Sequence, residues 1–178
     1  ELRLEVPQWG RFSGYLSYSN QSGIASGPIT GGLFLGSDVA DALTDTSQFA
    51  VSQDQRNTLH TRVRFQAERR FWLALSTQYG SGLPAELGDS DDQSFLLAQY
   101  GPKILSQVNF DRQRVRPNFS LDAAAGFQVY RKELRSAALQ IQVSNLLDRV
   151  NVINFASLFS GSAVDTPRSV SAGFKLTF

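Results

Sequence analysis

Residues that could carry catalysis are few, and their spacing does not complete a catalytic centre. His60 is the single histidine, so a serine hydrolase would have to use it as its base. No nucleophile elbow accompanies it, and Arg62 and Arg64 follow it at alternate positions. The chain has no cysteine, which removes thiolate nucleophiles and thiolate metal sites. We therefore expect no enzyme activity and no cofactor, and interpret His60 as an ordinary polar position.

An acidic cluster is the best candidate for a metal site, and it is incomplete. Asp89, Asp91 and Asp92 offer the carboxylates that calcium prefers. The spacing of an EF-hand, with its terminal glutamate, is absent, and one histidine leaves zinc short of ligands. We interpret this cluster as a solvated loop tip without a metal. The glycines of Gly31-Gly32 and Gly80–Gly82 lack the following lysine of a phosphate-binding loop, so they indicate turns.

Arginines form a third candidate site. Five of them occupy alternate positions in two segments: Arg62, Arg64, Arg112, Arg114 and Arg116. Arg112, Arg114 and Arg116 are each an even number of residues before Asp122. Alternation along a strand therefore predicts one common polar face for all five arginines. Such a cluster could hold an anionic ligand. The commoner role of such arginines is to pair with carboxylates such as Glu68 and Asp122, or with acidic residues of a plug, and both hypotheses stay open.

The elements that would position these residues are strands, because apolar residues recur with a period of two. Seven segments alternate in this way: Leu2–Val6, Phe12–Tyr18, Leu59–Ala67, Phe71–Tyr79, Phe119–Val129, Ala137–Val143 and Val170–Phe178. Most exceed the mean strand length of about 5–6 residues and approach the roughly 9–11 that cross a lipid bilayer. No segment shows a helical period of comparable length.

The connections alternate between short and long. Short turns are predicted at Pro7–Arg11, Glu68–Arg70 and Arg131–Leu134, and long loops at Gly23–Gln55, Leu83–Pro117 and Val150–Pro167. Outer-membrane barrels have this asymmetry, with short periplasmic turns and long extracellular loops. The second long loop partly alternates from Lys103 to Arg116, which indicates a strand extension there. The five arginines would then line the barrel lumen.

Alternation also predicts which face each side chain occupies. Phe71, Leu73, Phe127, Ile141 and Phe174 should share one face, and Gln78, Gln128, Gln142 and Lys175 the other. Phe71 and Tyr79 are separated by about 21 Å of height in a tilted strand, close to the apolar band of membrane barrels. Alternation does not say which face points inward, so a soluble antiparallel barrel or sandwich remains an alternative.

Composition sets further bounds. The net charge of +1 gives no reason to expect nucleic acid as a partner. No apolar run approaches the roughly 18 residues of a transmembrane helix. The chain has no methionine and starts without a signal peptide. We expect a mature or cut N-terminus.

The last sixty residues resemble the end of a TonB-dependent receptor. Five residues resemble the family's Asn-Leu-Phe-Asp-Arg motif, with leucine for phenylalanine: Asn145, Leu146, Leu147, Asp148 and Arg149. Upstream, Tyr79–Pro84 and Asp54–Asn57 are similar to receptors that carry a carboxypeptidase-like regulatory domain ahead of the plug.

The resemblance implies an all-β, antiparallel, up-and-down transmembrane barrel of 22 strands, a plug, and an N-terminal segment that contacts TonB. Residues 1–178 would be about seven C-terminal strands of that single barrel domain, without the plug and the N-terminal regions. It implies location in the outer membrane, contact with lipid, and energised uptake of a small nutrient whose identity is unknown. A passive porin-like barrel remains an alternative, and so, at a greater distance, does a soluble small-molecule binder.

The final strand resembles the signal that the barrel assembly machinery selects. Its alternating apolar residues, Val170, Phe174, Leu176 and the terminal Phe178, would supply side chains for recognition. A plain packing role for Phe178 against lipid is the alternative.

Overall fold

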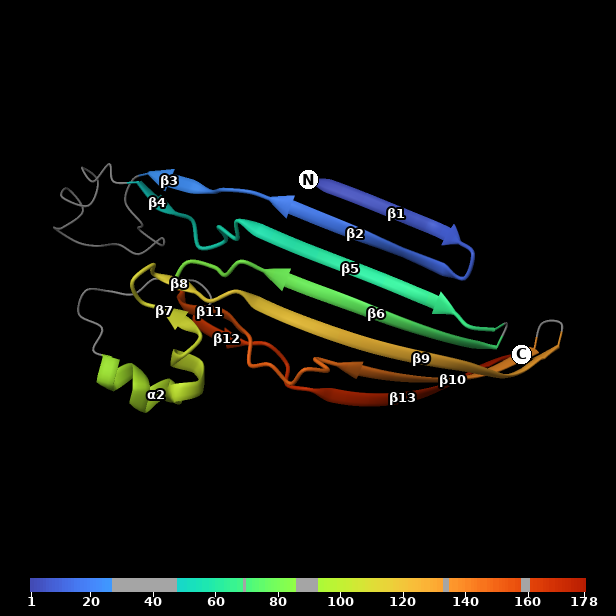
Figure 1. Cartoon of the computed structure of the whole chain (residues 1–178). Coiled ribbons are helices and arrows are strands. Elements are labelled where there is room, and N and C mark those ends of the chain that lie inside the picture. Colours follow the sequence, from blue (N-terminus) through green and yellow to red (C-terminus); the bar gives the residue numbers. More distant parts are fainter. Residues whose placement is uncertain (27–47, 69, 86–92, 133–134, 158–160) are drawn as a thin grey trace.

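One long antiparallel sheet organises the computed structural model, which describes residues 1–26, 48–68, 70–85, 93–132, 135–157 and 161–178. The sheet has seven strands in the order β1-β2-β5-β6-β9-β10-β13 (Figure 1). Their bounds are β1 Leu2–Trp9, β2 Phe12–Asn20, β5 Asn57–Gln66, β6 Phe71–Gly80, β9 Asn118–Lys132, β10 Arg135–Ser144 and β13 Ser169–Thr177. The predicted all-β antiparallel architecture, with sequential neighbours, is confirmed. Asp89, Asp91, Asp92 and Gly31-Gly32 lie outside the described residues.

The two ends of the sheet differ. The links β1–β2, β5–β6 and β9–β10 are short and lie together at what we call the short-turn end (Figure 1). The first is tighter than predicted, because β1 runs through Pro7 to Trp9, as the edge position of β1 allows. The opposite, long-loop end carries α2 (Gln93–Leu105) and three small hairpins: β3 (Ile24–Ser26) with β4 (Gln48–Ala50), β7 (Val108–Asn109) with β8 (Arg114–Val115), and β11 (Val152–Ser157) with β12 (Gly161–Val164).

The second long connection differs from its prediction. Lys103 to Arg116 does not extend the sheet: α2 ends at Leu105, and Val115 pairs back on Val108 in the β7–β8 hairpin. Pro117 follows and lacks an N–H, so it cannot continue a ladder into β9. The helix was missed because Gly101, with φ of 76°, and Pro102 interrupt its period. Among the described residues, no helix has the length and apolarity to cross a membrane.

Most fully buried apolar side chains lie at the long-loop end, beneath its hairpins. They form one cluster of Ala85, Leu96, Val108, Val115, Val152 and Phe155. Phe155 is completely buried, and the ring of Tyr100 meets its ring edge-on with centroids 4.9 Å apart. Burying such a side chain contributes about 1.5–3 kcal/mol. This cluster holds the long-loop end together independently of the faces of the large sheet.

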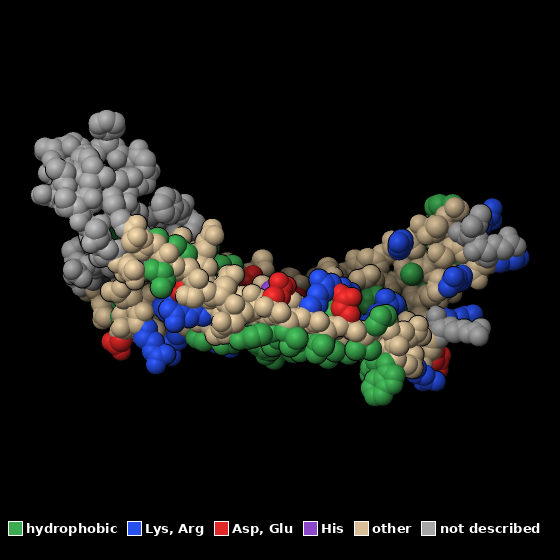
Figure 2. Space-filling model, turned by 90° about the horizontal axis from the view of Figure 1, so that it is seen from above, with side chains coloured by type: hydrophobic (Ala, Val, Ile, Leu, Met, Phe, Trp, Pro, Cys, Tyr) green, Lys and Arg blue, Asp and Glu red, His purple; other side chains and the backbone are tan. Residues whose placement is uncertain are grey.

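Strand register confirms the predicted faces. Residues directly opposite each other share a face, and Phe127 lies opposite both Phe71 and Leu139, while Leu139 also lies opposite Phe174. The residues predicted for the other face, which include Gln78, Gln142 and Lys175, occupy the alternate positions of the same strands. We call these the apolar face and the polar face. Figure 2 shows hydrophobic side chains gathered on one surface and charged ones on the opposite, hollowed surface.

One position departs from strict alternation. Ala137 lies opposite Tyr130, but Ala138 lies opposite Gln128, so Val129 is an extra residue in β9. The expected grouping of Val129 with Phe127 therefore ends at this irregularity, and Tyr130 joins the apolar face instead. A bulge re-aims the side chains that follow it in this way.

Candidate functional site

Aromatic side chains mark both borders of the apolar face. At the short-turn end they are Trp9, Phe12, Phe65, Phe71, Phe127, Tyr130 and Phe174, which we call the short-turn belt. At the other border Tyr18, Tyr79 and Phe119 form the long-loop belt. Between the belts the apolar face carries mainly aliphatic and small residues, such as Leu75 opposite Ala123. Many of these side chains are open to the surroundings of the chain; Leu75, for example, is 52% exposed.

Several polar atoms on the apolar face are hydrogen-bonded within the chain. The hydroxyls of Thr61 and Thr77, on neighbouring strands between the belts, are 2.7 Å apart. In the long-loop belt, the hydroxyl of Tyr18 donates to Asn57 Oδ1 at 2.7 Å. A hydroxyl moved from water to an apolar medium costs free energy unless it has such a partner. This face is therefore suited to an apolar environment.

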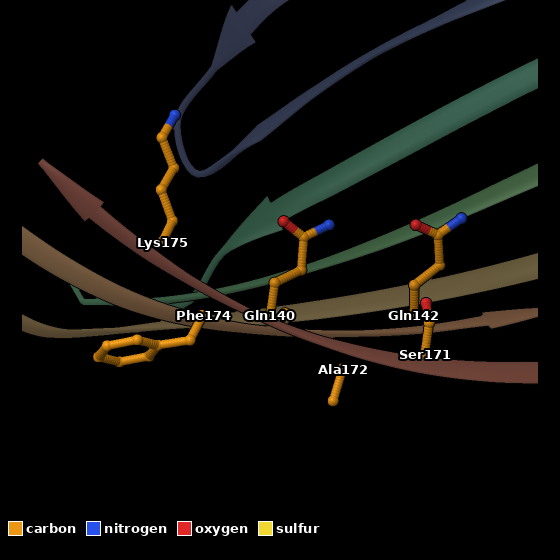
Figure 3. A pocket seen from close by; sticks show the side chains of 7 residues that line it. Gln140, Gln142, Ser171, Ala172, Phe174 and Lys175 are labelled. Carbon is orange, nitrogen blue, oxygen red and sulfur yellow. The ribbon is translucent and has the colours of Figure 1, made fainter.

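The polar face carries amides, hydroxyls and cations. Gln140, Gln142 and Lys175 project to one side of the sheet, while Phe174 and Ala172 project to the other (Figure 3). The three polar side chains line a shallow hollow of about 240 Å³. No metal-binding group of three or more acidic, histidine or cysteine residues occurs in the described part of the chain.

The five arginines of the predicted cluster are not brought together. Arg62 and Arg64 lie exposed on the polar face of β5, and the Arg64 guanidinium sits 4.5 Å from the centre of the Trp72 ring. Arg112 is exposed in the β7–β8 turn, and Arg116 is exposed just after β8. The parity that linked Arg112, Arg114 and Arg116 to Asp122 does not hold, because β9 begins only at Asn118. His60 lies opposite Gln78 on the polar face.

Arg114 instead binds a buried carboxylate at the long-loop end. Its Nη1 donates to Asp54 Oδ2 at 2.9 Å, and its Nη2 donates to the main-chain carbonyls of Asp54 and Gly82, the latter at 3.2 Å. Asp54 is 1% exposed and also accepts from the Gly23 amide at 3.0 Å and from Arg56 Nε at 3.4 Å. We call this group the Asp54 clamp.

Burial and hydrogen bonding act on Asp54 in opposite directions. Burial raises the pKa of its carboxyl group, because a charged form is disfavoured away from water. The hydrogen bonds from Gly23, Arg114 and Arg56 favour the carboxylate, and together they hold the pKa below its ordinary value. The clamp therefore contains an ionised aspartate over the ordinary pH range.

The two upstream segments of the family resemblance meet beside this clamp. Asn57 N donates to Ser81 Oγ at 3.0 Å, and Ser81 N donates to the Asn57 carbonyl at 2.9 Å. Gly82 has φ of 93°, and a Cβ there would collide with the Val115 carbonyl, so glycine is required. Residues that looked unrelated in the sequence thus form one hydrogen-bonded structure.

The Asn145–Arg149 motif builds the turn that leaves β10. Asn145 has φ of 49°, a left-handed conformation that asparagine tolerates, and is 3% exposed. Its side-chain amide donates to the carbonyls of Arg149 at 2.9 Å and Thr166 at 3.2 Å, and its Oδ1 accepts from Arg149 N at 3.1 Å. Its main-chain amide donates to Asp122 Oδ1 at 2.8 Å. The motif therefore ties β9, β10 and the segment leading into β13.

Asp148 and Arg149 extend this network outward. Asp148 pairs with Arg168 at 3.3 Å, and Arg149 Nη2 donates to the Pro117 carbonyl at 3.0 Å. Leu146 and Leu147 are exposed.

Asn151 has a structural role that its sequence context did not reveal. It is 3% exposed, and its side-chain amide pairs with both main-chain groups of Phe119, at 3.0 and 2.9 Å. The side chain thus substitutes for a strand partner where β10 has already turned away from β9. The available signal was an asparagine shortly after the motif, which is too weak to locate such a contact.

The predicted assembly-signal residues lie on or just beyond an edge strand. β13 pairs with β10 along one side and has no second partner among the described strands. Val170, Phe174 and Leu176 are exposed on its apolar face, and Phe178, which follows the strand, is 91% exposed.

Comparisons with known proteins identify a fold. No family model matches the chain, and no curated protein does. A solved structure is similar: the ferric-catecholate import receptor Fiu from K12 E. coli, in its closed form, with a TM-score of 0.55 at 15% identity. The match covers 95% of this chain and 18% of that receptor chain. This chain has the fold of part of a TonB-dependent receptor barrel. It spans under a fifth of the length of that receptor.

Proposed function

We propose that this chain is the C-terminal part of the barrel of a TonB-dependent outer-membrane receptor, which imports a small nutrient with energy delivered through TonB. The observation that carries the proposal is the pair of aromatic belts that border an exposed apolar face. Lipid-facing surfaces of membrane barrels have an apolar band between two aromatic girdles, with a polar interior behind it. The division between the two faces of this sheet matches that description.

The exposed apolar surface supports contact with lipid rather than water. Soluble monomers rarely expose continuous apolar patches beyond a few hundred Å², yet the apolar face extends across all seven strands of the sheet. Tyrosine and tryptophan at its borders, such as Tyr18 and Trp9, suit the boundary between lipid and water. The hydrogen bond between the hydroxyls of Thr61 and Thr77 also suits contact with lipid.

The polar face supports an interior occupied by a plug. Arg62 and Arg64 are exposed there and form no ion pair with another described residue. Cations on a barrel wall are satisfied by carboxylates of an enclosed domain or by an anionic ligand. We therefore assign this face to contacts with a plug that precedes the chain, and propose about seven of 22 strands here.

The receptor subtype is part of the proposal. The interlocked segments Asp54–Asn57 and Tyr79–Pro84 support a receptor with a carboxypeptidase-like regulatory domain ahead of its plug. Determining the coding sequence upstream of Glu1 tests this directly. A plug without a preceding regulatory domain would overturn the subtype and leave the receptor assignment intact.

Transport by the full-length receptor tests the function. Cells expressing it should accumulate a radiolabelled ferric catecholate, the first probe to try because the similar structure imports one. Accumulation should require TonB and stop when a protonophore collapses the proton gradient. TonB-independent uptake of small solutes would instead establish the passive porin-like alternative. Recovery of the receptor in the soluble fraction would establish the soluble alternative.

A further inference from the structure

Basic side chains concentrate at the short-turn end. Each short turn, or the strand ends beside it, contributes at least one exposed cation, and the described set consists of Arg11, Arg70, Arg131, Lys132 and Arg135. We call this set the basic collar. Figure 2 shows lysine and arginine side chains gathered at the end of the sheet that carries these turns. The collar therefore spans the three turns.

The collar lies immediately beyond the short-turn belt. Arg11 precedes Phe12, Arg70 precedes Phe71, and Arg131 follows Tyr130. Each of these aromatic residues is on the apolar face, at the border of its strand. In the third turn, Lys132 and Arg135 lie opposite each other on the apolar side of the sheet, one pair beyond Tyr130, whereas Arg131 lies opposite Ser136 on the polar side. Lys132, Arg135, Arg11 and Arg70 are therefore the collar cations beside the border of the apolar face.

Among the described residues, the collar cations have no carboxylate partner, unlike several cations at the opposite end. None of the five forms an ion pair with another described residue. At the long-loop end, Arg56 and Arg114 bind Asp54, and Arg168 binds Asp148. In the three turns and their flanks, residues 10–11, 67–70 and 131–135, the sequence has six basic residues against two acidic ones. The sequence of the three turns therefore carries net positive charge.

We propose that the basic collar binds the phosphate groups of anionic phospholipids in the membrane leaflet that the short turns face. This inference rests on the proposed membrane location of the chain. A phospholipid would lay its acyl chains on the apolar face, with its ester region against the short-turn belt. Its phosphate would then reach the depth of the collar. Clusters of lysine and arginine at a bilayer surface attract anionic lipids through the surface potential.

The distribution of the cations favours a lipid surface over an acidic protein. A protein partner would be served by a compact charged patch with an apolar core, since binding energy concentrates at the centre of an interface. The collar is instead a row that follows the belt from the β1–β2 turn to the β9–β10 turn. A row parallel to the apolar border is the arrangement that a planar layer of phosphates complements.

Lipid selection by the full-length receptor tests the inference. The receptor is incorporated into bilayer nanodiscs of equimolar phosphatidylglycerol and phosphatidylcholine, and native mass spectrometry counts the lipids that stay bound. The test variants are Lys132→Gln/Arg135→Gln and a quadruple variant that adds Arg11→Gln and Arg70→Gln. The matched control is Lys103→Gln/Arg112→Gln, which removes two exposed cations from the long-loop end. Heat modifiability first establishes that each receptor is folded in the bilayer.

The native receptor and the control should retain phosphatidylglycerol over phosphatidylcholine by about threefold or more. The double variant should lower this ratio, the quadruple variant should bring it near one, and about 0.5 M salt should weaken it by screening. A folded quadruple variant with the native ratio would overturn the inference. A native receptor without lipid preference would overturn it too, and would favour an acidic protein as the partner of the collar. In those two cases the proposed function stands. A native receptor that does not enter the bilayer would overturn both.

Discussion

The carboxylate of Asp54 and the guanidinium of Arg114 meet at 2.9 Å, although sixty positions separate them in the chain. The same guanidinium reaches the carbonyl of Gly82. One arginine thus connects the segment entering β5, the segment leaving β6 and the hairpin before β9. The contact adds to the buried apolar cluster at the long-loop end, where the hairpin strands are short and would be marginally stable alone.

Removing Arg114 should loosen the long-loop end. Arg114→Ala leaves the buried Asp54 carboxylate without its closest cation, and an unpaired buried charged group costs about 2–3 kcal/mol or more. Hydrogen exchange of the Gly23 and Val115 amides in the full-length receptor should accelerate accordingly. Arg168→Ala removes an exposed pair with Asp148 and should change local stability by under about 1 kcal/mol. Equal effects of the two substitutions would contradict the clamp.

Acid should open the same region at a pH set by Asp54. The pKa of this carboxyl is lowered in the folded chain, so its stabilising contribution is complete above its unfolded value of about 4. The contribution declines as the pH falls through the lower folded value. We therefore expect constant protection of the Gly23 amide from pH 5 to 8, estimated from ordinary carboxyl titration, and a loss below about 4. Asp54→Asn should remove this acid-dependent step, and a step of unchanged size in that variant would assign it to other carboxyls.

Asn145 should be the most sensitive residue of the Asn145–Arg149 motif. Asn145→Ala removes three side-chain hydrogen bonds and places alanine at a positive φ, which together should cost about 2–4 kcal/mol. Leu147→Ala, at an exposed position, should cost under about 0.5 kcal/mol. Urea titration of the heat-modifiable folded form compares the two. A tolerant Asn145 and a sensitive Leu147 would mean that the motif is kept for a contact outside this chain.

The threonine pair offers a test of the medium around the apolar face. In lipid, Thr61→Val or Thr77→Val should each leave the other threonine hydroxyl without its hydrogen-bond partner. The double variant should recover most of the lost folding stability. We expect a coupling free energy of about 0.6 kcal/mol in a double-mutant cycle, the average for hydrogen bonds inside bilayers, and at most about 1.7 kcal/mol. Additive single effects, measured by folding into lipid vesicles, would indicate that water reaches both hydroxyls.

Phe178 should matter for delivery more than for stability. Its ring is 91% exposed, so Phe178→Ala removes little packing. We expect a lower amount of folded receptor in isolated outer membranes, with the undelivered chain degraded in the periplasm. Phe127→Ala, within the short-turn belt, should lose part of a side-chain burial, of order 1–3 kcal/mol, and affect assembly less. The reverse order of effects on assembly would assign Phe178 to packing against lipid.

Several features of this chain could be predicted from its sequence because they are local. Strand faces follow from the alternation of side chains along an extended backbone, so Phe127 and Gln142 could be assigned to opposite faces without knowing their partners. The short turns followed from the breaks between alternating segments. Two local failures remain. The helix α2 was missed because Gly101 and Pro102 interrupt its period, and Val129 was misplaced because an extra residue in a strand leaves no mark in an apolar alternation.

The tertiary structure decided everything that depends on which distant residues meet. Arg114 looked like one more alternating arginine, but the Pro117 break and the β7–β8 hairpin turn it toward Asp54 instead of the polar face. Asn151 pairs with Phe119 only because β10 has already turned away from β9. The basic collar is a row only when three separate turns lie at one end of one sheet. Such contacts arise from pairing between strands far apart in the chain, and the composition or period of a single segment carries no record of them.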